Sequence, residues 1–183
     1  MSALSFYELA RTSHVKRWTI INTTKEQNLA EHQYNVTVIA MRLFINDVGE
    51  EISAEFILSA MFHDSAEIRY GDVPTSGKAF IRGASVLHDI FKQMDAAIIP
   101  RPPFAHKWAP DREMLYIKLA DLIEAAWWVG ENGAGHHART VAAKCWRAVE
   151  DFVHLHDLYD TANPVLIDLG LPFVNKSERI TPP

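Results

Sequence analysis

The residues best suited to chemistry in this chain are a histidine and acids at the end of an apolar segment. His63-Asp64 closes the apolar run 56–62, and Glu67 follows three residues later. A buried imidazole and carboxylate are costly without a partner, and a divalent cation would pair with both. On one helix the three side chains would share a face, so two could bind the ion while the third handles protons. The competing interpretation is a buried His63–Asp64 hydrogen bond with Glu67 in solvent.

Two further side chains are candidate ligands for the same ion. His32 stands where the segment 29–44 enters the core, and Asp121 interrupts the apolar segment 115–123. Two imidazoles and two carboxylates suit Zn²⁺, Co²⁺, Mn²⁺ or Fe²⁺, with Mg²⁺ as a further candidate. Positions left open to water would make such a site catalytic rather than structural.

The elements that must position these residues are helices. Apolar residues recur at helical spacing along most of the chain, and alternating segments are scarce. This pattern predicts an all-α, single-domain bundle over residues 1–183, with a polar tail from about residue 175. We expect helices over 29–44, from an N-cap at Ser53 towards residue 68, over 85–98, from an N-cap at Asp111 to a stop at Gly130, over 136–159, and from Pro164. The turn formers of 71–77 should separate the second helix from the third.

Composition narrows the class of protein. The chain has 183 residues, of which 48% are hydrophobic, and a formal net charge of −5, which argues against nucleic acid as a partner. Cys145 is the only cysteine, so neither an intramolecular disulfide nor a cysteine zinc finger can form. The sequence has no apolar run of membrane-spanning length, and residues 1–8 do not resemble a secretory signal. We therefore expect a cytoplasmic protein without a membrane partner.

The order His32, His63-Asp64, Asp121 resembles the H…HD…D signature of the HD-domain metal-dependent phosphohydrolases. The similarity is strongest to their small deoxynucleotide branch, which includes YfbR-type 5′-deoxynucleotidases and the DatZ-type dATP triphosphohydrolases of phages. The segments that carry the resemblance are 16–18, 30–32, 63–67, 71–75 and 118–121. It implies a helical HD-domain fold with one catalytic divalent ion, held by His32, His63, Asp64 and Asp121.

The resemblance also implies roles for charged residues around the ion. Glu67 would take a proton from water or give one to the leaving 5′-oxygen. Arg17 matches a position near the phosphate, and Asp72 matches an acid that positions Arg17 or water. Lys78 and Lys118 are candidates for phosphates further from the scissile bond, and the alternative for each lysine is an ordinary surface charge.

Two residues near the N-terminus are expected to set specificity. In the resembling enzymes a tryptophan at the position of Trp18 packs where a 2′-hydroxyl would lie, which favours deoxyribose. A bulky apolar residue at the position of Ile20 would press on the base edge and exclude the 2-amino group of guanine. The alternative is that Trp18 and Ile20 are simply core residues.

These observations predict a deoxynucleotide phosphohydrolase, most closely a dATP triphosphohydrolase that releases deoxyadenosine and triphosphate. A 5′-deoxynucleotidase that acts on monophosphates is the alternative, with the same metal and the same Glu67. A non-enzymatic helical binding module with a structural metal is a remote third hypothesis. The resembling enzymes form dimers or hexamers, so we expect a homo-oligomer.

Overall fold

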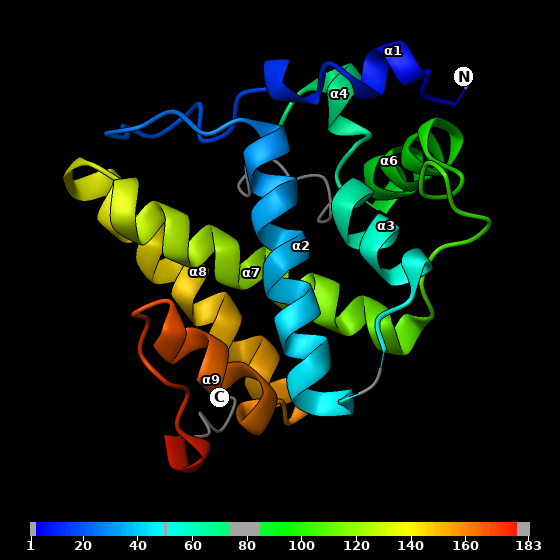
Figure 1. The fold of residues 1–183 in the computed structure, drawn as a ribbon. Coiled ribbons are helices and arrows are strands. Elements are labelled where there is room, and N and C mark those ends of the chain that lie inside the picture. The colour runs from blue at the N-terminus through cyan, green and yellow to red at the C-terminus, as the bar shows by residue number, and fades with distance from the viewer. Residues whose placement is uncertain (1–2, 50, 74–84, 179–183) are drawn as a thin grey trace.

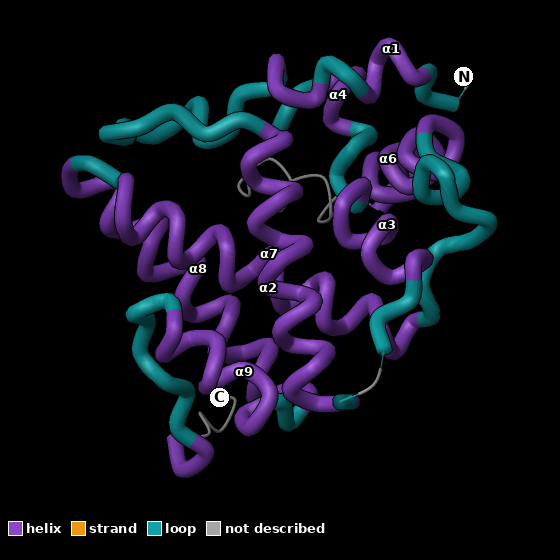
Figure 2. The backbone as a smooth tube through the Cα atoms, viewed as in Figure 1, coloured by secondary structure: helices purple, strands orange, loops and turns teal. Residues whose placement is uncertain are grey.

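Helices make up nearly all the regular structure of the computed structural model, which describes residues 3–49, 51–73 and 85–178 (Figures 1 and 2). Their order in those ranges is α1 (Phe6–Leu9), the 3₁₀ helix η1 (Thr12–His14), α2 (Leu29–Val48), α3 (Ala54–Phe62), α4 (Glu67–Tyr70), α6 (Ser85–Ile98), α7 (Asp111–Asn132), α8 (Gly135–His156), α9 (Tyr159–Asp168) and the 3₁₀ helix η2 (Lys176–Glu178). Extended pairing in the same ranges is limited to two isolated bridges, Lys16–Asn28 and Thr23–Gly133. The predicted all-α fold is confirmed.

The central helix α2 is longer than the sequence pattern predicts. The Asn28 side chain accepts the Glu31 N–H at 3.0 Å and caps the first turn. Gly49 ends the helix at φ +67°, in the left-handed region that glycine adopts without a Cβ penalty, and its N–H donates to the Ile45 carbonyl. The helix therefore reaches Val48 rather than residue 44.

The helix that begins after Ser53 does not continue unbroken to residue 68. Ser53 is the N-cap, as predicted, and accepts the Phe56 N–H, but α3 ends at Phe62. The chain then winds more tightly, with Glu67 N–H donating to the Asp64 carbonyl and Ile68 N–H to that of Ser65. Residues three apart are eclipsed in such a winding, so Asp64 and Glu67 still point the same way.

The boundaries of the C-terminal helices also differ from the prediction. Pro110, not Asp111, is the N-cap of α7, and the helix passes through Gly130 to Asn132. The stop is Gly133, where a Cβ would lie 2.5 Å from the Val129 carbonyl oxygen. The segment 136–159 is divided where Asp157 adopts φ 55°, and Pro164 lies inside α9 rather than at its start.

The core lies where α2 and α7 pack together. α7 and α8 run side by side across the molecule, and α2 crosses α7 (Figure 1). Side chains at the α2–α3–α7 contacts are almost fully buried, among them Val36, Leu43, Phe56, Leu119 and Ile123. In the described part of the chain, no helix is both long and apolar enough to span a membrane.

Candidate metal centre

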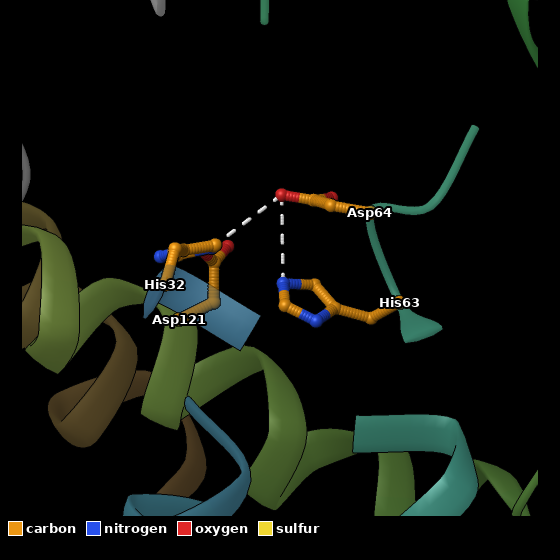
Figure 3. Close-up of side chains that lie close together, drawn as sticks. All are labelled: His32, His63, Asp64 and Asp121. Atoms are coloured by element: carbon orange, nitrogen blue, oxygen red, sulfur yellow. Dashed lines mark ion pairs between the residues drawn. The ribbon is translucent and has the colours of Figure 1, made fainter. Parts of the chain in front are cut away.

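Three separate elements bring the four predicted ligands to one point. His32 lies in the first turn of α2, His63 and Asp64 directly follow α3, and Asp121 lies on α7 (Figure 3). One nitrogen or oxygen atom of each side chain lies within 4.8 Å of those of the other three. His32 Nε2 is 3.5 Å from both Asp64 Oδ2 and Asp121 Oδ1, and His63 Nε2 is 3.5 Å from Asp64 Oδ2.

The hydrogen bonds of the two imidazoles fix which nitrogen is available to an ion. His63 Nδ1 lies 2.8 Å from the Ala60 carbonyl oxygen, and His32 Nδ1 lies 2.7 Å from Glu124 Oε2. A carbonyl and a carboxylate can only accept, so in the neutral form of each ring Nδ1 carries the proton and Nε2 presents a lone pair. Both Nε2 atoms are buried and find no hydrogen-bond partner among the described residues.

These residues fit a divalent cation. Two ligand atoms that are each 2.0–2.2 Å from one zinc ion are separated by about 3.4 Å at the tetrahedral angle, close to the spacing observed here. The two nitrogen and two oxygen donors suit borderline metals such as zinc, and a cation would satisfy both orphaned lone pairs. The cluster of His32, His63, Asp64 and Asp121 is a metal site by geometry and donor chemistry.

Burial and neighbouring charges shift the pKa values of the predicted ligands in different directions. Burial and the Arg17 cation disfavour a charged His32, but the carboxylates of Asp64 and Glu124 outweigh them and raise the pKa of His32 to about 9. Burial dominates at His63 and lowers its pKa. Burial alone would raise the pKa of Asp121, but Lys118 and the histidines hold it well below the ordinary value. The site thus favours positive charge at its centre.

Arg17 is the cation that faces this acidic cluster. Its side chain is only 9% exposed, and its Nη1 lies 3.5 Å from Asp64, 3.6 Å from Glu67 and 3.9 Å from Asp72. Burial opposes its charge, but these carboxylates outweigh burial and raise its pKa. Its Nε and Nη1 make no hydrogen bond to the described residues, so donors remain for a ligand. Arg17 therefore lies close to Asp64 of the cluster and to two further acids, Glu67 and Asp72.

Trp18 and Ile20 have different surroundings. The Trp18 ring stacks on Trp128 with centroids 5.7 Å apart and planes within 4°, and its backbone has φ 58°. Ile20 is 55% exposed, so it is not a core residue in this chain. Stacking on Trp128 thus orients the Trp18 ring, whereas the Ile20 side chain lies at the surface.

Of the two lysines predicted to bind phosphate, the structure describes Lys118. Lys118 Nζ lies 2.6 Å from Asp121 Oδ2, so this lysine pairs with a predicted ligand. Its side chain is half exposed and can reach solvent or a substrate. Lys78 lies outside the described residues.

Sequence reasoning did not single out Gln27 or Glu124. Glu124 is fully buried and accepts hydrogen bonds from Gln27 and Asn35 as well as from His32. A signal existed, because Glu124 interrupts an apolar segment three residues after Asp121, just as Asp121 itself does. Gln27 carried no such signal in the sequence, because a glutamine just before a helix is common.

A cavity of about 210 Å³ adjoins the cluster. Its lining includes His63, Asp64, Tyr70, Asp95 and Trp108, and the Tyr70 hydroxyl donates to Asp95 at 2.8 Å. An aromatic ring and hydrogen-bonding groups beside a metal cluster are typical of a small-molecule site.

Comparison with known proteins identifies the family. A profile of the YfbR-like 5′-deoxynucleotidases matches residues 5–127, which contain all four clustered ligands. The chain belongs to the YfbR-like family. It is an HD-domain phosphohydrolase, and its fold is the single-domain helical HD fold.

Relatives of this YfbR-like chain act on deoxynucleotides. It is 34% identical over 142 residues to the dATP triphosphohydrolase of Cyanophage S-2L, covering 74% of this chain and 75% of the relative. It is 28% identical over 158 residues to a 5′-deoxynucleotidase of Vibrio vulnificus, covering 76% and 80%.

A solved structure supports the same assignment. The Cyanophage S-2L HD phosphohydrolase DatZ, bound to dA and one catalytic Zn²⁺ ion, superposes with a TM-score of 0.75 at 25% identity, covering 93% of this chain and 99% of that one. The YfbR-like chain is thus an enzyme of the deoxynucleotide phosphohydrolase class with a His/Asp metal site.

Proposed function

We propose that this enzyme is a dATP triphosphohydrolase that converts dATP and water to deoxyadenosine and triphosphate. The observation that carries the proposal is the convergence of four metal-binding side chains with the buried Arg17 guanidinium and Glu67. Within a few ångströms, such a site offers ligands for a metal cation, hydrogen-bond donors for phosphate oxygens, and a carboxylate that can carry a proton. The choice of dATP rests on similarity to the phage triphosphohydrolases.

His32, His63, Asp64 and Asp121 would hold one divalent ion, with zinc as the first candidate. When bound, the ion lowers the pKa of a coordinated water towards neutrality and polarises a phosphoryl oxygen. The reaction joins the water oxygen to the phosphorus nearest the sugar and breaks the bond from that phosphorus to the 5′-oxygen.

The chain's own residues bind the phosphate and move the proton. Arg17 presents guanidinium donors that suit phosphate oxygens, and the carboxylates of Asp64, Glu67 and Asp72 keep it charged and in place. Glu67 faces the same space and would deliver a proton to the departing 5′-oxygen. The half-exposed Lys118 side chain would turn from Asp121 to bind the outer phosphates of the substrate. Lys78 is a second candidate for the same phosphates.

Trp18 would select the sugar. Its indole is fixed by stacking on Trp128, and a rigid apolar ring against C2′ leaves a ribose hydroxyl without a hydrogen-bond partner. Ile20 would select the base. Because Ile20 is exposed in the single chain, we propose that self-association, as a dimer or hexamer, encloses it near the site.

The second candidate is a 5′-deoxynucleotidase that releases phosphate from deoxynucleoside monophosphates. The match to the YfbR-like profile and the Vibrio vulnificus relative favour it. The same P–O5′ bond would break with the same residues, so only the number of phosphates on the substrate differs.

Product analysis tests the choice. Protein stripped of metal and reloaded with Zn²⁺, Co²⁺, Mn²⁺ or Mg²⁺ is incubated with dATP, dGTP, ATP and dAMP, and triphosphate and phosphate are separated by ion exchange. We expect triphosphate from dATP, with ATP turned over at least about a hundredfold more slowly. Phosphate from dAMP without triphosphate from dATP would establish the second candidate instead. Equal turnover of ATP would contradict the role of Trp18, and rapid turnover of dGTP that of Ile20.

A further inference from the structure

An unbroken chain of hydrogen bonds runs from Trp18 to the metal ligand His32. Trp18 Nε1 donates to Gln27 Oε1 at 2.7 Å, and Gln27 Nε2 donates to Glu124 Oε1 at 2.5 Å. The other oxygen of the same carboxylate, Oε2, accepts from His32 Nδ1 at 2.7 Å. Gln27, Glu124 and His32 are each at most 1% exposed, so water does not compete for these bonds.

The donors and acceptors of this series of hydrogen bonds can be arranged in only one way. An indole N–H can only donate and a carboxylate can only accept, so the Gln27 amide must turn its oxygen to Trp18 and its nitrogen to Glu124. The flipped amide would face a donor with a donor and an acceptor with an acceptor. Gln27 therefore holds the Trp18 ring and the Glu124 carboxylate at the same time, through opposite ends of one planar group.

One face of α7 supports both ends of this chain. Asp121, Glu124 and Trp128 follow one another at spacings of three and four residues, so they share a helical face. Asp121 is a predicted metal ligand, Glu124 fixes the other ligand on α2, and Trp128 is the platform on which Trp18 stacks. The left-handed backbone of Trp18 is one that bulky residues rarely adopt, and its surroundings must hold it there.

We propose that Gln27 is a positioning residue that ties the sugar-sensing Trp18 to the metal ligand His32 through Glu124. Metal affinity and discrimination against ribose then depend on the same hydrogen-bonded chain, although Gln27 contacts neither the ion nor the sugar. The part that concerns the sugar rests on the function proposed above for Trp18, whereas the part that concerns the metal does not.

Gln27→Met tests the proposal, because methionine has a similar length but neither donates to Glu124 nor accepts from Trp18 as an amide does. The zinc affinity of metal-free protein is measured by competition with a chromophoric chelator, in the absence of nucleotide. Loss of groups that orient metal ligands weakens binding about 10- to 100-fold, and we expect a loss in that range. The ratio of kcat/KM for deoxyribo- to ribonucleotide should fall as well, measured with dATP and ATP or with dAMP and AMP, whichever pair the wild type hydrolyses.

Trp18→Phe provides a second variant that does not disturb the buried Gln27. It keeps an aromatic ring to stack on Trp128, but removes the N–H that fixes the amide together with part of the indole surface. We expect zinc affinity to fall by at least about threefold, an effect that a residue touching only substrate would not produce. Because Trp18 is only half-buried, this variant carries the test if Gln27→Met does not fold.

Matched controls separate coupling from general loss of stability. Thr161→Val removes a partly buried hydrogen bond from the Thr161 hydroxyl to Asp47, fifteen residues along α2 from His32. Trp146→Phe replaces a partly buried tryptophan of α8 with a smaller ring. Both should bind zinc as the wild type does. Wild-type zinc affinity in folded Gln27→Met, or in Trp18→Phe, would overturn the proposal. If the wild type hydrolyses no nucleotide, the proposed function fails, while the zinc affinities still decide this inference.

Discussion

At the level of single residues, the two histidines of the metal centre are held by different acceptors. His63 donates to a backbone carbonyl within its own helical turn, whereas His32 donates to the carboxylate of Glu124 from another helix. A carboxylate partner increases the basicity of an imidazole more than a neutral carbonyl does, and so strengthens it as a ligand. We infer that His32 is the stronger of the two nitrogen ligands and that Glu124 is the reason.

Glu67→Gln tests the proton transfer at this scale. Glutamine retains the shape of the side chain but cannot exchange a proton, so turnover should fall by about 10²- to 10⁴-fold. Zinc content should stay at the wild-type level, because Glu67 lies outside the four-residue cluster. Activity and metal content are measured on the same samples. Activity within tenfold of wild type would remove the proton-transfer role, and loss of zinc would make Glu67 a ligand.

The sequence predicted which residues meet at the metal, but not how each is held. His32, His63, Asp64 and Asp121 stood out because polar groups in apolar segments need partners, and that argument requires no coordinates. Lys118 pairs with Asp121, one helical turn away, and its predicted contact with phosphate stays a prediction. The role of Gln27 depends on a contact 97 positions away, which no local pattern contains.

At the level of elements, the segment after α3 is the feature that the sequence pattern described least well. Apolar periodicity continues through 56–68, but the structure tightens after Phe62 into turns closed three residues apart. This winding turns His63 and Asp64 towards α2 and α7 and keeps the Glu67 side chain on the same side of the segment as Asp64. Periodicity distinguishes helix from strand, but it does not resolve a change from four-residue to three-residue hydrogen bonding.

Phe56 anchors α3, and its loss should be costly. The side chain is fully buried, with its ring 5.0 Å from that of Phe44. Truncation to alanine leaves a cavity between α2 and α3 and should lower the free energy of unfolding by about 3–5 kcal/mol. The matched control is Ile167→Ala on α9, which is 63% exposed and should change it by less than about 0.5 kcal/mol. Urea titrations of both variants measure this, and a Phe56→Ala loss no larger than the control would show that α3 is not anchored there.

The short helix α1 is attached by a charge pair that should respond to acid. Arg69 of α4 donates from Nε and Nη2 to Glu8 at 2.8 and 3.1 Å, and this pair with the Ser5 hydrogen bonds lowers the pKa of Glu8 to about 2. A lowered carboxylate pKa means that the pair stabilises the fold above about pH 4.5 and loses this effect as the pH falls towards 2. The effect is small because the pair is partly exposed.

Glu8→Gln makes that contribution measurable. At pH 7 the variant should have a slightly lower Tm than the wild type. The difference should narrow as the pH falls from 4.5 towards 2, because the wild-type carboxylate is then protonated too. Melting curves of both proteins are measured over this range. The difference in Tm at each pH cancels the titration of the groups that the two proteins share. A constant difference would mean that packing, and not charge, attaches α1.

At the level of the whole molecule, the metal site depends on how α2 crosses α7. His32 and Asp121 are 89 positions apart, and the contact between these two helices brings them within 3.5 Å. The same crossing buries Glu124 against His32, so one packing arrangement provides both the ligands and their support. The sequence indicated that the helices exist and which faces are apolar, but the crossing follows from side-chain packing between distant segments.

An ion at this site should therefore stabilise the entire fold. The cluster places two carboxylates and two buried ring nitrogens together, so a divalent cation would neutralise the acids and satisfy both nitrogens. Zinc at about a hundred times its dissociation constant should add roughly 2.7 kcal/mol, which for a chain of this length corresponds to a Tm rise of roughly 5–10 °C. Excess EDTA should reverse the rise. Asp121→Asn weakens the site without emptying the core, so its Tm should barely respond to zinc at the same concentration. If zinc does not change the Tm of the wild type, the four side chains meet without binding an ion. If the Tm of Asp121→Asn rises as much as that of the wild type, the zinc binds elsewhere on the molecule.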